Sequence, residues 1–192
     1  MPFFSIIAAS ALSVALNDVG TATHLQNAYH GSERGSVLFR AWVAPSGKIL
    51  ECEVLEVSVD ERLRSTFCPI YQRQRITPAR GPDGKPTYSL IESINIFDPG
   101  SVNDLKLPAD ATFTANDLPD GAPEYRIFAT LVVDERGKVS ECETSRKASQ
   151  TYAKLLCAAV AERRMEVKYD EAGQAVQYVT GFWGSFRPSA GG

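Results

Sequence analysis

The sequence lacks the short motifs that identify common enzyme classes. It contains no G-x-S-x-G nucleophile motif, no H-E-x-x-H zinc motif, no P-loop and no dinucleotide-binding glycine fingerprint. Its two histidines, His24 and His30, are six positions apart near the N-terminus. Exposed linker histidines are commoner than a metal site with this spacing. Because Ser, Cys and Lys nucleophiles have no evident base, we expect no enzyme activity, no cofactor and no metal; an enzyme of unknown class is a minor alternative.

Basic residues are too few for a typical nucleic-acid-binding protein. The 192 residues include 20 Lys and Arg against 23 Asp and Glu, which gives a formal net charge of -3. A nucleic-acid-binding surface needs a basic patch or stripe. Arg73, Arg75 and Arg80 form a small basic cluster, which we interpret as a solvent-exposed helix end rather than an anion site. We therefore expect no nucleic-acid partner.

The N-terminal apolar run is too short for a transmembrane helix. Residues 2–16 carry no charged side chain, but spanning a bilayer takes roughly 20 residues. A signal peptide over residues 1–15 fits better, and small residues at Ala11 and Ala15 predict cleavage shortly after one of them. No Lys or Arg precedes the run, so a buried N-terminal helix or a weak membrane anchor are the alternatives. We expect no stable membrane span.

The sequence also lacks a C-x-x-C pair, which argues against zinc sites and thioredoxin-like redox sites. Its four cysteines are Cys52, Cys68, Cys142 and Cys157. In an exported protein they would form disulfides, whereas in a cytosolic protein they would be buried free thiols. Four cysteines allow three pairings.

An internal repeat favours one of these pairings. "GKILECEV" at residues 47–54 returns as "GKVSECET" at residues 137–144. Cys52 and Cys142 are 90 positions apart, and Cys68 and Cys157 are 89 apart, which an internal duplication explains. Because an ancestral single copy had to be stable alone, we predict disulfides within each copy, Cys52 with Cys68 and Cys142 with Cys157. Each closed loop of about 17 residues would contribute roughly 3 kcal/mol.

The first copy predicts a hairpin, a helix and a third strand. Residues 36–44 and 48–57 are rich in β-formers and flank a Pro-Ser-Gly turn. Alternation in the second strand places Leu50, Cys52 and Val54 on one face and Glu51 and Glu53 on the other, where we interpret the glutamates as solvent-exposed rather than catalytic. The predicted helix is capped at Ser65 or Thr66 and has Pro69 in its first turn. The apolar residues that recur at helical spacing, and are expected to face inward, are Leu63, Phe67, Ile70 and Tyr71. The third strand ends at Phe97.

The second copy repeats this order. Residues 125–133 and 139–145 predict a hairpin, and the last strand ends at Phe186. A helix capped near Ser149 would turn inward Tyr152, Leu155, Leu156, Ala159 and Val160. The predicted fold is therefore α+β, with two tandem small β-β-α-β units, each an antiparallel three-stranded sheet with one helix. The predicted segments are a signal peptide (1–15), an N-terminal extension (16–34), the first domain (35–97), a linker (98–123), the second domain (124–187) and a disordered tail (188–192).

These features resemble the C-terminal domain of the TonB family, in particular its disulfide-bearing variants. The resemblance is carried by a hairpin turning at Gly-Lys, a cysteine in its second strand, a cysteine in the helix, and "RITPARGPDGKP" at residues 75–86. The first copy matches over residues 35–97. The second, over residues 124–186, keeps the cysteines and turns but has "RMEVKYDEAGQAV" where Pro-Ala would stand. Together the copies cover about two thirds of the chain.

The resemblance implies a periplasmic module that binds a protein or peptide by strand addition. In TonB itself this domain transmits force to outer-membrane transporters, after a membrane-spanning N-terminus and a long Pro-rich spacer that this sequence does not show. We therefore expect a periplasmic or secreted protein-binding or scaffolding module. Its expected partner is a peptide, an envelope protein or an outer-membrane protein. A TonB-type energy transducer for outer-membrane transport is the alternative.

The third strand of each copy supplies the predicted partner-binding residues. They are Tyr88, Ser89, Ile94 and Ile96 in the first copy and Tyr178, Phe182 and Trp183 in the second. A three-stranded sheet leaves open edges to which an extended peptide can add. Because the linker does not force the copies together, we expect these edges to stay available, the alternative being edge-to-edge pairing into one sheet. Aromatic residues on these strands, and Trp42, can instead fill the core or the seam between the copies.

Overall fold

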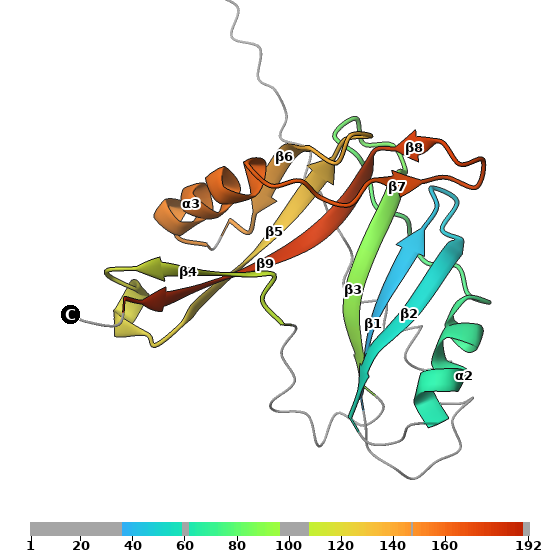
Figure 1. The fold of residues 1–192 in the computed structure, drawn as a ribbon, viewed down its shortest axis with the longest axis horizontal. Coiled ribbons are helices and arrows are strands. Elements are labelled where there is room, and N and C mark those ends of the chain that lie inside the picture. The colour runs from blue at the N-terminus through green and yellow to red at the C-terminus, as the bar shows by residue number, and fades with distance from the viewer. Residues whose placement is uncertain (1–35, 59–61, 97–107, 147, 190–192) are drawn as a thin grey trace, which may run out of the picture.

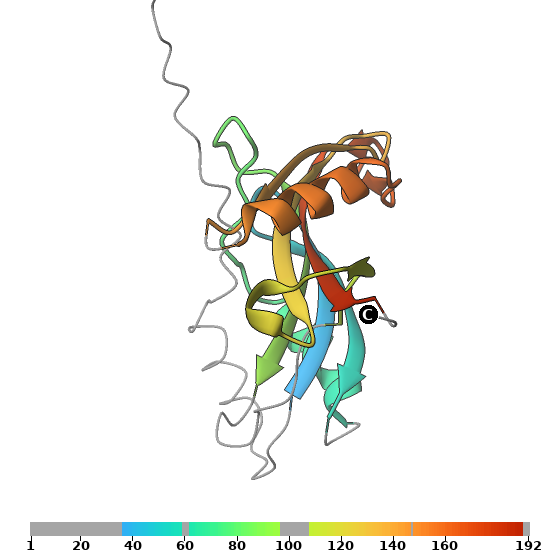
Figure 2. The same ribbon diagram turned by 90° about the vertical axis from the view of Figure 1, so that its left-hand side faces the viewer.

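The computed structural model describes residues 36–58, 62–96, 108–146 and 148–189. Within them the protein is mixed α+β, as predicted, with a seven-stranded sheet, a separate two-stranded ribbon and two α-helices. The predicted signal peptide, the N-terminal extension and the two histidines lie outside the described residues. Figures 1 and 2 show the arrangement in two views.

The first half of the described chain forms β1 (Ser36–Val43), β2 (Ile49–Val57), α2 (Arg62–Tyr71) and β3 (Tyr88–Ile96). Strand β1 lies between β2 and β3 and is antiparallel to both, and the three strands lie side by side in Figure 2. The helix begins before the predicted cap at Ser65 or Thr66, so Pro69 lies inside it rather than in its first turn. Burial of Phe67 and Tyr71 offsets the hydrogen bond that this proline removes.

The face predicted for Leu50 is wrong because β2 contains a β-bulge. Trp42 pairs with Glu51 and Val43 pairs with Ile49, which leaves Leu50 without a directly opposite residue. The extra residue reverses the alternation at this point. Ile49 and Cys52 pack towards α2, whereas Leu50 packs with Trp42 on the other face.

The second half forms β5 (Tyr125–Val133), β6 (Val139–Thr144), α3 (Gln150–Ala161) and β9 (Tyr178–Pro188), with the ribbon β7 (Lys168–Tyr169) and β8 (Ala175–Val176) before β9. As predicted, Ser149 is the N-cap of α3, and the helix buries Tyr152, Leu156 and Val160. The inward position predicted for Leu155 is wrong, because 52% of it is exposed. Its neighbour Leu156 occupies the inward stripe, and residues one apart on a helix do not share a face. The predicted linker contributes β4 (Ala111–Ala115) and the 3-10 turn η2 (Pro119–Gly121).

The two halves join into one sheet, which corrects our expectation that their edges stay apart. The strand order is β2-β1-β3-β9-β5-β6, with β4 added to β9. The junction is a short parallel pairing of residues 88–90 in β3 with residues 178–180 in β9. Figure 1 shows the two strands together at this junction and diverging beyond it. Pairing satisfies backbone groups that two separate sheets would leave exposed.

The register of this junction places the two helices on opposite faces of the sheet. Tyr88 lies beside Tyr178, and Ser89 lies beside Val179. Tyr178 belongs to the cluster under α3, whereas Tyr88 lies on the face of β3 that points away from α2, as Leu90 and Trp42 do. Residues directly opposite in a sheet share a face. The face covered by α3 is therefore the one that α2 leaves free.

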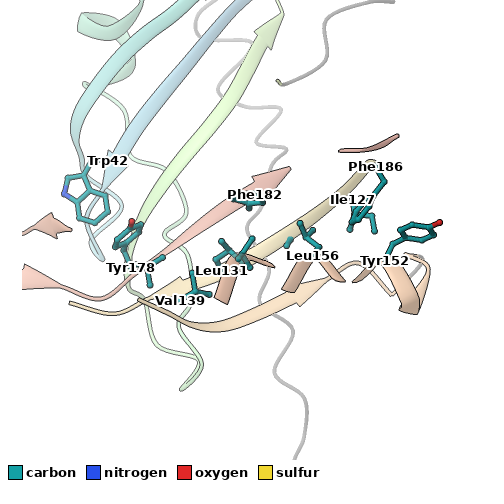
Figure 3. Packing of buried hydrophobic residues seen from close by; sticks show 12 residues of the cluster. Trp42, Ile127, Leu131, Val139, Tyr152, Leu156, Tyr178, Phe182 and Phe186 are labelled. Atoms are coloured by element: carbon teal, nitrogen blue, oxygen red, sulfur yellow. The ribbon is translucent and has the colours of Figure 1, made fainter. Parts of the chain in front are cut away.

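Each half also contributes packing to the other. Trp42 of β1 is 2% exposed and belongs to the core cluster under α3, beside Tyr178 (Figure 3). In the opposite direction, Ala79 from the segment between α2 and β3 packs on Val132 and Val179 of the second half. These contacts make the seam between the halves part of the hydrophobic core.

Tyr178 gives the seam a pH-dependent stability. Its hydroxyl donates to the carbonyl of Glu166 at 2.8 Å, and burial raises the pKa of Tyr178 to about 12. The unfolded chain releases this proton near pH 10, so the contribution is full below pH 10 and is lost as the pH rises towards 12. We expect Tyr178→Phe to lose less stability than the wild type between pH 9 and about 11.5, measured by urea unfolding. An equal loss in both proteins would contradict this assignment.

Candidate peptide-binding fork

A fork opens in the sheet where β3 and β9 separate. Beyond residue 180, β9 pairs in parallel with β4. This pairing runs from Ala111 opposite Gly184 to Ala115 opposite Pro188. Residues 91–96 of β3 keep β1 on one side, and no described residue forms a strand on their other side. We use the name "the fork" for the space lined by Leu90, Ile91, Glu92, Asp110, Phe128, Gly181 and Trp183. The cavity that these residues enclose has a volume of about 20 Å³, which is room for about one water molecule.

The backbone of β3 directs hydrogen-bonding groups into the fork. The carbonyl of Leu90 points towards β9, because it accepts a hydrogen bond from the Thr180 hydroxyl at 3.0 Å. Successive residues of a strand direct their N–H and C=O groups to alternate sides. Glu92 and Ile94 therefore direct theirs towards the fork, while Ile91 and Ser93 direct theirs to β1. Such an open edge is a template for another strand.

One face of the fork is acidic. Glu92 accepts hydrogen bonds from Arg40 Nε at 2.7 Å and from Arg40 Nη2 at 2.5 Å. Glu53 lies 3.9 Å from Arg40 on its other side. Because Arg40 pairs with Glu53 and Glu92 across neighbouring strands, all three side chains share the face that points away from α2.

Asp110 adds a second carboxylate to the lining of the fork. Its Oδ2 accepts a hydrogen bond from the N–H of Trp183 at 2.6 Å, and its own N–H donates to the Trp183 carbonyl at 2.8 Å. The pKa of Asp110 is raised, chiefly because its surroundings exclude water, and the negative charge of Glu92 adds to the effect. The N–H of Trp183 and the charge of Arg40 act in the opposite direction. Both backbone contacts hold Asp110 at the start of β4.

The other face of the fork is aromatic. The rings of Phe128 and Trp183 lie 5.1 Å apart, and the guanidinium of Arg126 lies 5.1 Å from the centre of the Trp183 ring. Gly181 makes room for this pair, because a Cβ there would lie 2.6 Å from Phe128 Cε2. The indole Nε1 of Trp183 is buried and has no hydrogen-bond partner among the described residues. A buried donor of this kind costs free energy unless a ligand or water accepts from it.

The structure places only some of the predicted partner-binding residues at this fork. Trp183 lines it, and Ile94 lies half-buried on the open stretch of β3. Tyr178 and Phe182 are 1% and 3% exposed and pack in the core cluster under α3, so they do not line the fork. Tyr88 and Ser89 lie at the junction with β9. The side chain of Ile96 lies outside the described residues.

Sequence reasoning missed Glu92, Asp110 and Phe128. Glu92 carried a signal, because it is the one charged residue in the strand segment "LIESI". Asp110 carried none, since it lies in a linker rich in Pro, Asp and Gly. Phe128 reads as an ordinary strand residue.

Both predicted disulfides are present, away from the fork. Cys52 Sγ of β2 lies 1.97 Å from Cys68 Sγ of α2, and Cys142 Sγ of β6 lies 2.00 Å from Cys157 Sγ of α3. Each bond ties a helix to the outer strand of its half. Disulfides of this kind are typical of an oxidising, extracytoplasmic environment.

A second hollow lies between the first hairpin and the β7–β8 ribbon. It has a volume of about 260 Å³ and is lined by Trp42, Lys48, Leu50, Glu51, Tyr169, Asp170 and Glu171. Its main polar groups already have partners. Lys48 Nζ pairs with Glu171 at 2.6 Å, and Trp42 Nε1 donates to the carbonyl of Tyr169 at 3.2 Å. The fork, with an open strand edge and an indole donor that both lack a partner among the described residues, is the stronger candidate.

The described part of the chain offers neither a metal-binding cluster nor a membrane-spanning helix. Residues 36–58, 62–96, 108–146 and 148–189 contain no group of three or more His, Cys, Asp or Glu side chains placed to hold a metal ion. In the same residues, neither helix has the length and apolar character needed to cross a membrane. The sequence matches no family model, no curated protein and no solved structure.

Proposed function

We propose that this protein is an exported module, periplasmic or secreted, that binds an extended peptide or a segment of an envelope protein by strand addition. The peptide adds to β3 in the fork. One observation carries the proposal: residues 91–96 of β3 have β1 on one side and no strand among the described residues on the other. A peptide bound there completes the backbone hydrogen bonding of β3.

Strands β2 and β6, which end the main run of the sheet, are less suited to this role. Strand β2 ends the sheet on one side and carries exposed Glu51, Glu53 and Glu56. Strand β6 ends it on the other side and carries Glu141 and Glu143. Charged side chains on an edge strand oppose pairing with a further strand. The open stretch of β3 also carries one carboxylate, Glu92, but that charge is paired with Arg40, and the fork is bordered by Phe128 and Trp183 as well.

Repeated backbone geometry supports two tandem β-β-α-β units derived by duplication. Gly47 and Gly137 have φ values of 78° and 75°, a left-handed conformation that favours glycine. Their carbonyls accept hydrogen bonds from Ile76 N at 3.0 Å and from Met165 N at 2.8 Å. A Cβ at Gly47 would lie 2.2 Å from the Ile76 carbonyl oxygen, and one at Gly137 would lie 2.4 Å from that of Met165. Both hairpins therefore meet the segment after their helix in the same way.

Ile94→Pro tests strand addition. It removes an N–H that points into the fork and leaves the N–H groups that face β1, so the fold should persist as it does at other edge prolines. We expect capture of partners from an envelope fraction to be lost. Binding of a nine-residue alternating Val/Ser peptide should weaken by roughly threefold to tenfold, since one backbone hydrogen bond contributes about 0.5–1.5 kcal/mol. Fluorescence anisotropy measures the peptide affinity.

Ile94→Ala is the matched control, because it removes the side chain and keeps the N–H. It should retain most of the affinity that Ile94→Pro loses. In hydrogen exchange on the wild type, the bound peptide should slow the amides of Glu92 and Ile94, which point into the fork. Equal binding by both variants, with no slowing of these amides, would exclude strand addition at β3.

A further inference from the structure

We propose that the fork selects extended peptides in which a basic side chain alternates with apolar ones. The basic side chain lies beside Glu92 and Asp110, and its apolar neighbours lie on the side of Phe128 and Trp183. This inference rests on the proposed strand addition and adds the chemistry of the peptide that is bound.

The two faces of the sheet keep these environments apart. On β3, Leu90 and Glu92 point to the face away from α2, whereas Ile91 shares the face of Ala41 and packs in the cluster under α2. On β9, Gly181 and Trp183 alternate with the core residues Thr180 and Phe182, so they point away from α3. Because α2 and α3 cover opposite faces, Ile91 and Trp183 lie on the same face and Glu92 lies on the other.

A strand added to β3 must present its side chains to both environments. Directly opposite residues of two paired strands share a face, so the peptide residue opposite Glu92 points to the acidic face. The residues before and after it point to the aromatic face. An alternating peptide therefore satisfies both faces in only one of its two registers, and a one-residue slip would bury its charge among aromatic rings.

The acidic face has uncompensated negative charge. The charged groups around it are the carboxylates of Glu53, Glu92, Asp110 and Glu166 and the cations of Arg40 and Lys168. Lys168 Nζ pairs with Glu166 at 3.0 Å. Arg40 serves both Glu92 and Glu53, so Asp110 has no cation of its own in direct contact among the described residues. Carboxylates therefore outnumber cations among these groups, which favours a ligand cation at this face.

The aromatic face disfavours the same cation. Arg126 lies over the Trp183 ring and already supplies a positive charge there. The carboxylate nearby, that of Glu124, accepts a hydrogen bond from the Ser185 hydroxyl at 2.5 Å and lies 3.4 Å from the Arg187 guanidinium. The buried Nε1 of Trp183 is a donor, so it suits a peptide carbonyl and not a second donor. A basic side chain therefore has one favourable face in the fork and an apolar side chain has the other.

Three peptides test the selectivity. Each has nine residues, with Val alternating with Ser, and the central Ser is kept or replaced by Lys or by Glu. We expect the wild type to bind the Lys peptide about threefold to fivefold more tightly than the Ser peptide, and the Glu peptide least tightly. Asp110→Asn, which keeps an oxygen to accept from Trp183 N–H, should reduce the preference for Lys by at least about half. Fluorescence anisotropy at low and moderate ionic strength measures all affinities.

Glu141→Gln on β6 is the matched control, since it removes the same charge from an exposed position far along the sheet. It should leave the preference unchanged, and an equal effect in Glu141→Gln and Asp110→Asn would overturn the inference by showing that only net charge matters. Equal binding of the Lys and Ser peptides would overturn the selectivity. If that binding were still sensitive to Ile94→Pro, strand addition would stand. Binding of none of the three peptides would overturn both proposals.

Discussion

Replacing Trp42 by Ala is expected to lower the free energy of unfolding by about 3–5 kcal/mol, the range for deleting a large buried aromatic side chain. Trp42 is 2% exposed, although it lies on β1 of a sheet face that α2 does not cover. Its ring stacks on Tyr88 at 5.3 Å and meets the edge of Tyr178 at 5.5 Å. Its Nε1 donates to the carbonyl of Tyr169. The substitution therefore removes contacts between the two halves as well as apolar burial.

Urea unfolding followed by circular dichroism measures this loss. Trp183→Ala is the matched control, because it deletes the same side chain from a position that is only half-buried, so its effect should be clearly smaller. If the seam is the main role of Trp42, its loss should also increase hydrogen exchange at the junction residues Ser89 and Val179. Equal destabilisation by the two variants would contradict a special role for Trp42 in joining the halves.

The second large effect is expected from the disulfides. Replacing both Cys52 and Cys68 by Ala, or both Cys142 and Cys157, should lower the free energy of unfolding by about 3 kcal/mol in each case. The two bonds close loops with sequence separations of 16 and 15, so the chain-entropy model predicts nearly equal losses. Paired substitution avoids leaving a lone thiol free to react. Differential scanning calorimetry without reductant measures both variants.

The two double variants control for one another. Each should increase hydrogen exchange mainly in its own helix, α2 or α3, because each bond ties that helix to the edge strand of the same half. The fork should still bind peptide in both, since neither disulfide contributes to its lining. If both variants were as stable as the wild type, the disulfides would not be needed to stabilise the fold.

Local features were sufficient to predict the elements and the disulfides. The Gly47 and Gly137 turns, the β-rich runs around them and the cap at Ser149 act over a few residues, so their consequences are visible in the chain itself. The cysteine pairing followed from the repeat spacing. Two predictions of side-chain direction were wrong. At Leu50 a β-bulge changed the alternation of the strand, and of the adjacent Leu155 and Leu156 only Leu156 lies on the buried face of the helix.

The joining of the halves depended on tertiary structure. Backbone hydrogen bonds between β3 and β9 carry little side-chain information, so the sequence could not select between separate edges and one sheet. The register that places Tyr88 opposite Tyr178 then decided which face of the sheet each helix covers. The fork follows from that junction, because β4 pairs with the far end of β9 and brings Asp110, from an unremarkable linker, into the same lining as Glu92. Residues distant along the chain became one site only because the strands that carry them pair for three residues and then separate.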